Sequence, residues 1–396
     1  MAEQVIGQKY LTMLDSHLLR LRKSYDHSNR RLHYDQLLCA WLLALFNPAI
    51  RSLRCLEDLS QIPRFQEQLD LEAICRNTAS SATHLFDPAL LEPIIAELRA
   101  RLPEPLLRQQ DPQLAQILKA VVAADGSYFT IASHVAWALH HHRSDGQVQG
   151  QIRLNWQLRI LDGMPGPCSV SGAEQGKEAA AMAQLLEGGL IYVVDRHYVD
   201  FAFLKAVLGA NSEFVLRARS NAPSFVPQED RPLSEQDLAA GVIRDRVGTL
   251  PGGRWSPAAP RQLVREVVIL NEQTKETVRL LTSLLEVEAA VIGLIYRYRW
   301  QVELFFRWLK VLAHFEHLWA HSRNGLTIQF YVAVIGVLLM YVRTGQRLSK
   351  YGYAMMTLVA SGQATLEQIV PILERRERER ELERQRLERK RAQKTT

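Results

Sequence analysis

Between Leu118 and Asp195 the chain contains four short segments with strand character, and two of them lead directly into an aspartate. LKAVVAAD ends on Asp125, and GLIYVVD ends on Asp195. Between them, apolar residues alternate with polar ones over 152–160, and this period of two predicts a half-buried strand. GSYFTIA, directly after Asp125, is expected to return as the paired strand of a hairpin. We therefore expect an α/β fold with both aspartates at carboxyl ends of core strands, where such sheets place their ligands.

The helix expected over YRYRWQVELFFRWLK has one strongly polar face. At about 100° per residue, Tyr296, Arg299, Glu303 and Lys310 project within an arc of about 60°. The opposite side carries an apolar stripe that begins at Val302 and suits docking on a core. A carboxylate can hold a divalent cation and its cationic neighbours can hold phosphates, which favours metal-assisted phosphoryl transfer on a nucleic-acid backbone. The alternative is an ordinary exposed face, on which Glu303 pairs with Arg299 one turn away.

Together with the two aspartates, Glu303 makes three carboxylates that can converge from distant parts of the sequence. Three such groups close together repel one another and raise one another's pKa. Two Mg²⁺ ions, for which Mn²⁺ can substitute, remove this repulsion, and a pair about 3.5–4 Å apart suits in-line attack at a phosphodiester. Asp125, Asp195 and Glu303 are therefore the predicted catalytic and metal-binding residues. For each aspartate taken alone, a cap or turn role at a strand end is the alternative.

Charge and composition limit the partners and the compartment. The chain of 396 residues has a net charge of +6, which permits a polyanionic partner. Its four cysteines lie far apart and no signal peptide is evident, so a cytoplasmic protein with reduced thiols is expected. The apolar run over 328–342 is shorter than the roughly 20 residues that span a bilayer. We therefore expect a buried helix there and no membrane partner.

These motifs, taken in order, resemble the DDE transposases of the insertion-sequence-4 type. The signature of that family is Tyr-x2-Arg-x3-Glu-x6-Lys, and the four residues from Tyr296 to Lys310 match it. AVVAADGS at Asp125 is similar to the first acidic motif of the family, and VVDRHYVD at Asp195 is similar to the second. The second motif departs at His197, where the family usually has Gly, and this concerns the local turn geometry. The resemblance covers nearly all of the chain except the charged C-terminal tail.

The resemblance implies a ribonuclease-H-like catalytic core with a β-rich insertion, preceded by a helical N-terminal region. The expected domains are a helical, DNA-binding region at 1–110, a catalytic domain at 111–345 with the insertion at about 220–276, and a C-terminal helical region with the charged tail at 346–396. The implied activity is cut-and-paste transposition by nicking, hairpin formation and strand transfer. The implied partners are double-stranded DNA at the inverted-repeat ends of the element and target DNA, with a homodimer in the complex. A nucleoid-associated bacterial protein is expected.

Tyr296, Arg299 and Lys310 are expected to bind DNA beside the scissile bond, and Trp255 of the insertion is a fourth candidate. Hairpin formation distorts the DNA end, and an extruded base needs an aromatic face on which to stack. Trp255 lies in the polar loop PGGRWSPAAP, and the resemblance also assigns an aromatic residue of the insertion to a flipped base. The alternative is that Trp255 fills the small apolar centre of its own subdomain.

Two other functions remain open from the sequence. One is a DNA-binding protein descended from a transposase that no longer catalyses. The other is a ribonuclease-H-like nuclease that cleaves DNA without strand transfer.

Overall fold

The computed structural model divides into two compact units. One combines Met1–Pro103 with Trp308–Thr396, and the other is Glu104–Arg307. The structure describes residues 12–47, 50–63, 66, 73–102, 111–131, 135–142, 146, 148–163, 165–220, 222–251, 262–271, 275–303, 306, 318–345, 350–360, 363–364 and 366–392. The domain boundaries expected from the sequence stay a prediction, and each unit is described by itself below.

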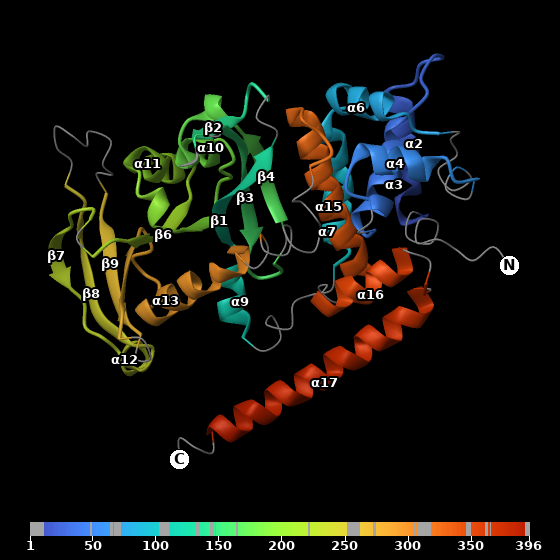
Figure 1. Cartoon of the computed structure of the whole chain (residues 1–396). Helices are drawn as coiled ribbons and strands as arrows, with labels where there is room; N and C mark the ends of the chain where they lie inside the picture. Colours follow the sequence, from blue (N-terminus) through green and yellow to red (C-terminus); the bar gives the residue numbers. More distant parts are fainter. Residues whose placement is uncertain are drawn as a thin grey trace. The chain divides into compact units, whose positions relative to one another are not determined.

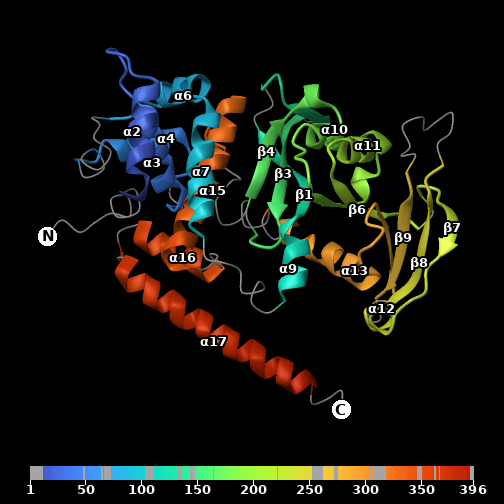
Figure 2. The ribbon, with the colours of Figure 1, turned by 180° about the vertical axis from the view of Figure 1, so that it is seen from behind.

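The unit at Glu104–Arg307 is built on a ten-stranded sheet (Figures 1 and 2). The strands run in the order β2-β3-β1-β5-β6-β10-β9-β8-β7, with β4 paired to β3. Their bounds are β1 (Val121–Ile131), β2 (Leu139–His142), β3 (Val148–Arg159), β4 (Pro165–Ser171), β5 (Ile191–Val194), β6 (Glu213–Ala218), β7 (Val226–Asp230), β8 (Val242–Thr249), β9 (Val264–Leu270) and β10 (Thr277–Thr282). The mixed α/β fold expected from the alternating patterns is confirmed.

Parallel pairing at the centre of this sheet brings the two aspartates together. Strand β1 pairs with β5 in parallel from Val121 opposite Ile191 to Ala123 opposite Val193. Continued by two residues, the same register places Asp125 opposite Asp195. Side chains alternate between the two faces of a strand, so Asp125 and Asp195 lie on the same face as the pair of Ala123 and Val193.

Strand β1 runs through Asp125, so the hairpin expected at this point is wrong. The strand continues from Val121 to Ile131 because β3 offers an unbroken antiparallel partner, from Arg159 opposite Val122 to Gly150 opposite Ile131. Only the parallel partner β5 ends beside Asp125. The aspartate therefore lies where one edge of β1 loses its backbone partner.

Strand β3 is buried on both faces, whereas its alternating sequence predicted a half-buried strand. Arg153, Asn155 and Gln157 are each at most 2% exposed, and each of them makes hydrogen bonds to other polar groups inside the unit. The Arg153 guanidinium donates to Asn155 Oδ1 at 3.0 Å, and the Gln157 amide donates to the Leu185 carbonyl at 2.7 Å. Alternation correctly predicted the strand, but the polar side chains belong to an internal hydrogen-bond network.

Three helices of this unit position the site. Helices α10 (Glu178–Ala183) and α11 (Phe201–Gly209) share one core with β1, β5 and β6, which includes Tyr192 and Phe214. Helix α13 (Ala289–Tyr298) packs on β6, β8 and β9. Asp200 caps α11, because its carboxylate accepts from the Ala202 N–H at 2.8 Å. Further helices of this unit are α9 (Pro112–Lys119) and α12 (Glu235–Ala239).

The segment expected to form an inserted subdomain contributes strands to the main sheet. β9 pairs with β10, β8 with β9, and β7 with β8, so the sheet extends outward from the core strand β6 (Figure 1). The periodicity is weak at β7 because all five residues of this strand are exposed, so no buried face imposes a period of two.

In the other unit, helix α15 (Arg323–Thr344) packs against α3 (Tyr34–Leu45), α6 (Arg76–Leu85) and α7 (Glu92–Ala100). This helix is long and apolar enough to cross a membrane, but 83% of its most apolar window is buried inside the unit. The buried helix expected over 328–342 is confirmed. Further helices are α2 (Asp15–Ser24), α4 (Leu53–Ser60), α16 (Lys350–Ala360) and α17 (Leu366–Ala392).

Candidate active site

Asp125 lies at the centre of the site and carries an unusual charge environment. Its side chain is 19% exposed. Burial, together with the nearby carboxylates of Asp195 and Glu178, raises the pKa of Asp125 to about 7, against the Gly126 N–H and Arg299, which lower it. A carboxyl group with this pKa is half-protonated near neutral pH. The site therefore favours a cation that can replace the proton.

Asp195 follows β5 and forms the cap of the short helix η4 (Arg196–Tyr198). One carboxylate oxygen accepts from the His197 N–H at 2.8 Å, and the other lies 2.7 Å from His197 Nδ1. Among the described residues other than glycine, only Asn211 and Lys275 have positive φ, so His197 fits this turn without backbone strain. The departure from the family pattern at His197 thus leaves the position of Asp195 intact.

The helix expected to carry the polar stripe has a tightened turn at Arg299. Helix α13 ends at Tyr298, the Arg299 N–H bonds to the Tyr296 carbonyl at 3.1 Å, and helical residues resume at Trp300. Because the regular 3.6-residue pitch is interrupted, the projection made from sequence applies only approximately across this point. Val302, the first residue of the expected apolar stripe, is fully buried.

Arg299 links two of the predicted catalytic carboxylates. Its guanidinium lies 3.9 Å from Asp125 Oδ2 and donates to Glu303 Oε1 at 2.5 Å. The Arg299 side chain is 12% exposed and the Glu303 side chain 34% exposed, so this ion pair is partly shielded from water. The positively charged guanidinium group of Arg299 therefore lies between the carboxylates of Asp125 and Glu303.

Tyr296 supports Arg299 through its ring. The guanidinium carbon of Arg299 lies 5.6 Å from the centroid of the Tyr296 ring, within the range of a cation–π contact. Within the described part of the chain, the buried Tyr296 hydroxyl has no hydrogen-bond partner. Lys310 and Trp255, the other two predicted DNA-binding residues, lie outside the described residues.

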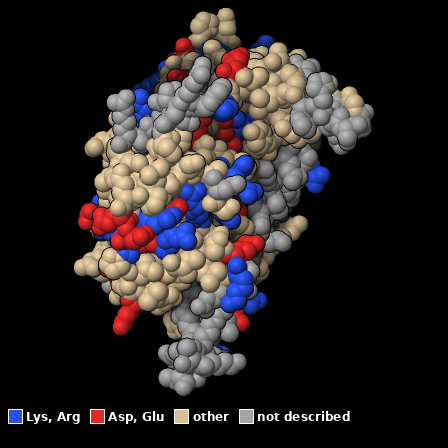
Figure 3. Space-filling view, turned by 90° about the vertical axis from the view of Figure 1, so that its left-hand side faces the viewer, with Lys and Arg blue, Asp and Glu red and all other residues tan. Residues whose placement is uncertain are grey.

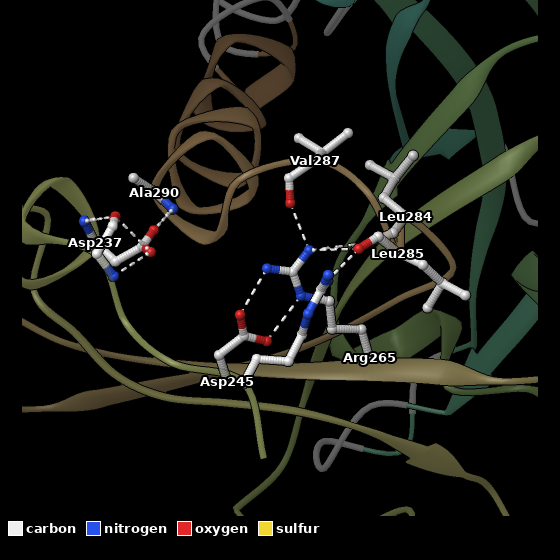
Figure 4. Close-up of polar contacts among 9 residues, drawn as sticks. Asp237, Asp245, Arg265, Leu284, Leu285, Val287 and Ala290 are labelled. Atoms are coloured by element: carbon white, nitrogen blue, oxygen red, sulfur yellow. Dashed lines mark hydrogen bonds and ion pairs between the residues drawn. The ribbon is translucent and has the colours of Figure 1, made fainter. Parts of the chain in front are cut away.

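A buried polar network fixes the start of α13 (Figure 4). Arg265 forms a bidentate ion pair with Asp245, at 2.7 Å and 2.6 Å, and also donates to the carbonyls of Leu285 and Val287 just before the helix. The Asp237 carboxylate accepts from the Ala290 N–H at 2.8 Å. The outer part of the sheet therefore holds the helix that carries the polar stripe.

The sequence did not single out Glu178, the first residue of α10. It influences the pKa of Asp125, and its carboxylate packs against Gly126. No motif or spacing marks this residue, because the contact depends on how α10 returns to β1. An acidic residue in the first turn of a helix was the only signal available.

The donor atoms fit a hard divalent cation. All are carboxylate oxygens, and burial together with the nearby acids raises the pKa of Asp125 even with Arg299 beside it. No group of three His, Cys, Asp or Glu side chains among the described residues is close enough to hold an ion together. Mg²⁺ needs only one or two carboxylates when water and phosphates supply its other ligands, which Asp125 and Asp195 can satisfy.

The outer strands carry a second polar surface. A groove of about 510 Å³ is lined by residues that include Arg244, Arg246, Glu266 and Arg279. Burial alone would raise the pKa of Glu266, but hydrogen bonds from Arg246 and Arg279 hold it below its usual value. Three guanidinium groups against one carboxylate leave this groove positively charged. Figure 3 shows the molecule from the side of these strands, where basic and acidic side chains are interspersed with uncharged areas.

The transposase DDE domain model matches residues 116–339, which is more than half of the chain and includes all three predicted catalytic residues. The chain belongs to the transposase DDE domain family. The matched region starts in α9, just before β1, and ends within α15.

Known proteins with related sequences are transposases by name. The chain is 28% identical over 218 residues to the putative transposase y4zB of Sinorhizobium fredii, covering 55% of this chain and 59% of that protein. It is 22% identical over 280 residues to a putative transposase for the insertion sequence element IS4SA of Synechocystis sp., covering 68% and 72%. It is 24% identical over 157 residues to a probable transposase for the element IS5377 of Geobacillus stearothermophilus, covering 40% of each. Two of these matches span less than two thirds of the relative's length.

Among solved structures, a piggyBac transposase synaptic complex with hairpin DNA aligns with a TM-score of 0.36 and 13% identity. The alignment covers 93% of this chain and 82% of that chain. The likeness is too loose to carry an argument about this protein.

Proposed function

We propose that this protein is a DNA transposase that cleaves and joins DNA by metal-dependent phosphoryl transfer. The observation that supports the proposal is that charged side chains lie together at the carboxyl end of β5. The β1–β5 register brings Asp125 and Asp195 side by side, and Arg299 joins Asp125 to Glu303. Membership of the transposase DDE domain family supports the same activity.

In this proposal Asp125, Asp195 and Glu303 are the catalytic carboxylates. Asp125 and Asp195 would hold divalent cations, two Mg²⁺ ions or Mn²⁺ in their place, with Glu303 completing the set. Bound there, the ions would activate the attacking oxygen and stabilise the leaving oxygen of the phosphodiester. Because Arg299 binds both Asp125 and Glu303, it would turn toward a DNA phosphate once the cation neutralises these carboxylates.

Arg299, Lys310 and Tyr296 would bind the DNA strand beside the scissile phosphate, and Trp255 would stack on an extruded base during hairpin formation. The positively charged groove formed by Arg244, Arg246 and Arg279 offers additional phosphate contacts. Phosphate contacts of this kind supply affinity without sequence information, so the helices of residues 1–110 are the candidates for recognition of the element ends.

The finer classification is a transposase of the insertion-sequence-4 type with a ribonuclease-H-like core. The Tyr296, Arg299, Glu303 and Lys310 signature supports the type, together with the similarity to the putative transposase for IS4SA. The parallel order β1-β5-β6 with antiparallel β3 and β2 beside β1 supports the core. The proposed partners are the inverted-repeat ends of the element and target DNA, bound by a homodimer in the bacterial cytoplasm, at the nucleoid.

The proposal is tested with a plasmid that carries the coding sequence together with its natural flanking DNA. Purified protein and Mg²⁺ should release a linear element with hairpin ends, detected on denaturing gels, and should join it to a second plasmid. Asp125→Asn, Asp195→Asn and Glu303→Gln should each abolish nicking while DNA binding persists. Glu286→Gln, at an exposed carboxylate before α13, is the matched control and should cleave normally.

The same assay separates the competing functions. Binding without any nicking by the wild-type protein would favour a DNA-binding protein that no longer catalyses. Nicking without joining would favour a nuclease that lacks strand transfer. Substantial cleavage by the Glu303→Gln protein would contradict the assignment of this residue.

A further inference from the structure

The groove on the outer strands lies on the face of the sheet that α10 and α11 cover. Arg279 on β10, which lines the groove, pairs with Ala218 on β6, and directly opposed residues point to the same face. Ala218 belongs to the core that the two helices share, as does Ala124 on β1. Asp125 is the next residue on β1, so its side chain points to the other face. The groove and Asp125 therefore lie on opposite faces of one sheet.

Helix α13, which leads to Arg299, packs on the face that carries Asp125. At the outer strands, Val268 lines the groove, whereas its neighbour Ile269 lies against Gly293 of this helix. Figure 1 shows α13 on the opposite side of β6 from α10 and α11. The strands pair continuously from β1 to β8, so the twist of the sheet turns the outer strands but does not exchange the two faces. DNA bound at Asp125 and Arg299 thus has the sheet between itself and the groove.

Two arginines of the groove are held in fixed positions. Arg246 donates to Glu266 Oε2 at 3.0 Å and Arg279 donates to Glu266 Oε1 at 2.7 Å, and the Glu266 side chain is only 3% exposed. Arg279 also donates to the carbonyls of Arg219 and Pro223, at 2.9 Å and 3.0 Å. A guanidinium group that is already ordered loses little conformational entropy when it binds a ligand. This part of the groove is therefore preorganised.

A third arginine of the groove, Arg244, is available to a partner from outside. Its side chain is exposed, and within the described residues it forms no hydrogen bond or ion pair. Ser224 and Thr277, which bear hydroxyl groups, also line the groove. Guanidinium and hydroxyl groups of this kind bind the phosphates of a nucleic-acid backbone. An internal ion-pair cluster around Glu266 does not need Arg244, so this residue and the volume of about 510 Å³ point to an external anion.

We propose that this groove binds the phosphodiester backbone of a second DNA segment, distinct from the segment that is cleaved at Asp125. Arg244 makes the outermost phosphate contact, and the less exposed Arg246 and Arg279 contribute their remaining N–H groups. The inference rests on the proposed function because it takes DNA as the partner, but none of these arginines belongs to the proposed cleavage site. Flanking DNA of the same molecule and a separate duplex present the same phosphates, so the test distinguishes these two sources.

The test measures DNA binding by the full-length protein without metal, using fluorescence anisotropy over a series of salt concentrations. The first probe is a short duplex of the element end, which reports the cleaved segment alone. The second is a long duplex that continues into flanking DNA. The third is a duplex of random sequence, added to protein that is already saturated with the unlabelled short duplex.

Arg244→Ala should bind the short duplex with the wild-type salt slope and should lose roughly one from the magnitude of the slope on a probe that fills the groove. A change on the long duplex assigns the groove to flanking DNA, and a change on the random-sequence duplex alone assigns it to a separate duplex. Arg244→Lys keeps the charge and should keep the wild-type slopes. Lys205→Ala, at an exposed lysine on α11, is the matched control and should behave as the wild type does.

Two results would overturn the inference. One is a wild-type slope for Arg244→Ala on all three probes. The other is a loss on the short duplex, because the groove would then contact the cleaved segment itself. These measurements require neither metal nor turnover, so they do not depend on whether the protein cleaves DNA. Absence of Mg²⁺-dependent nicking by the wild-type protein would instead overturn the proposed function.

Discussion

Asp125 is a residue whose burial beside other acids lowers the stability of the protein, although the proposed chemistry needs its carboxylate. Its carboxyl group is largely buried and lies near two other acids, and Arg299 and the Gly126 N–H offset part of the charge. The pKa of about 7 reflects burial and the repulsion between the acids, since the folded protein holds a proton that a free aspartate releases. A bound cation would offset the repulsion between these carboxylates.

The stability of the metal-free protein should therefore depend on pH through Asp125. The pKa of this group rises from about 4 in the unfolded chain to about 7 in the folded one, so the free energy of unfolding falls as pH rises through this window and is constant above it. Asp125→Asn should be more stable than the wild type at pH 8, by on the order of 2 kcal/mol, and the difference should vanish near pH 4. Urea unfolding across the pH range measures both, with Asp230→Asn as the exposed control. A difference that does not change with pH would contradict the assignment.

A second prediction concerns Arg299, whose contribution to DNA binding can be measured separately from the contributions of neighbouring residues. We expect Arg299→Ala to weaken binding to element-end DNA and to lower the magnitude of the salt slope by roughly one for each phosphate that the arginine binds. Arg297→Ala changes an exposed arginine on the same helix and is the matched control. Fluorescence anisotropy over a series of salt concentrations gives the slopes. An unchanged slope with normal hairpin formation would make Arg299 a structural residue.

At the level of elements, the outer strands hold helix α13 in place. Arg265 and Asp245 are at most 5% exposed, and together with Asp237 they tie β8 and β9 to the backbone at the start of α13 (Figure 4). A buried ion pair of this kind need not add stability over an apolar pair, but it fixes geometry because every donor needs its acceptor. Strands β8 and β9 thus position helix α13.

Breaking this pair should be far more costly than replacing it. Arg265→Met leaves Asp245 buried without a partner and should lower the free energy of unfolding by about 3–5 kcal/mol. The double variant Arg265→Met with Asp245→Leu should recover a large part of that stability. Arg246→Met is the milder control, because Glu266 keeps its second partner, Arg279. Urea denaturation of the four proteins provides the comparison, and equal destabilisation of the single and double variants would disprove the coupling.

Local patterns predicted some elements well and failed where the partner strand decides. The apolar runs before Asp125 and Asp195 predicted β1 and β5, since β-branched and apolar residues mark buried strands. The continuation of β1 past Gly126 depends on β3, and no local signal encodes that partner. The polar stripe of Tyr296, Arg299 and Glu303 was visible as spacing, whereas Glu178 approaches only through the packing of α10. Contacts within one element are readable from sequence, and contacts between elements are much less so.

For the whole molecule, charge is concentrated at the C-terminus. Residues 374–396 contain ten Lys or Arg against six Glu, which accounts for much of the net charge of +6. In the structure, most of this segment belongs to helix α17, which ends at Ala392. DNA phosphates attract such a basic segment without regard to sequence.

Removing the end of this helix should weaken non-specific DNA binding without unfolding the protein. A chain that ends after Glu379 loses seven Lys or Arg and three Glu, so its salt slope for random-sequence DNA should be shallower. Its thermal midpoint should match that of the full chain, since the removed residues are exposed wherever the structure describes their side chains. Changing the three Glu beyond Glu379 to Gln in the full chain should strengthen binding instead. Binding that is equal in all three proteins would rule out a role for the tail.

The pairing of β1 with β5 also affects how fast this part of the protein can fold. These strands are joined by a long crossover, and contacts between residues distant in sequence form slowly because the chain must first close a large loop. Glu303 lies later in the chain than β10, which pairs with β6, and than α13, which packs on the sheet. A ribosome therefore releases nearly the whole of this unit before the three predicted carboxylates can meet. On the proposed function, copies whose synthesis stops before Glu303 lack one of these carboxylates and should leave DNA uncut.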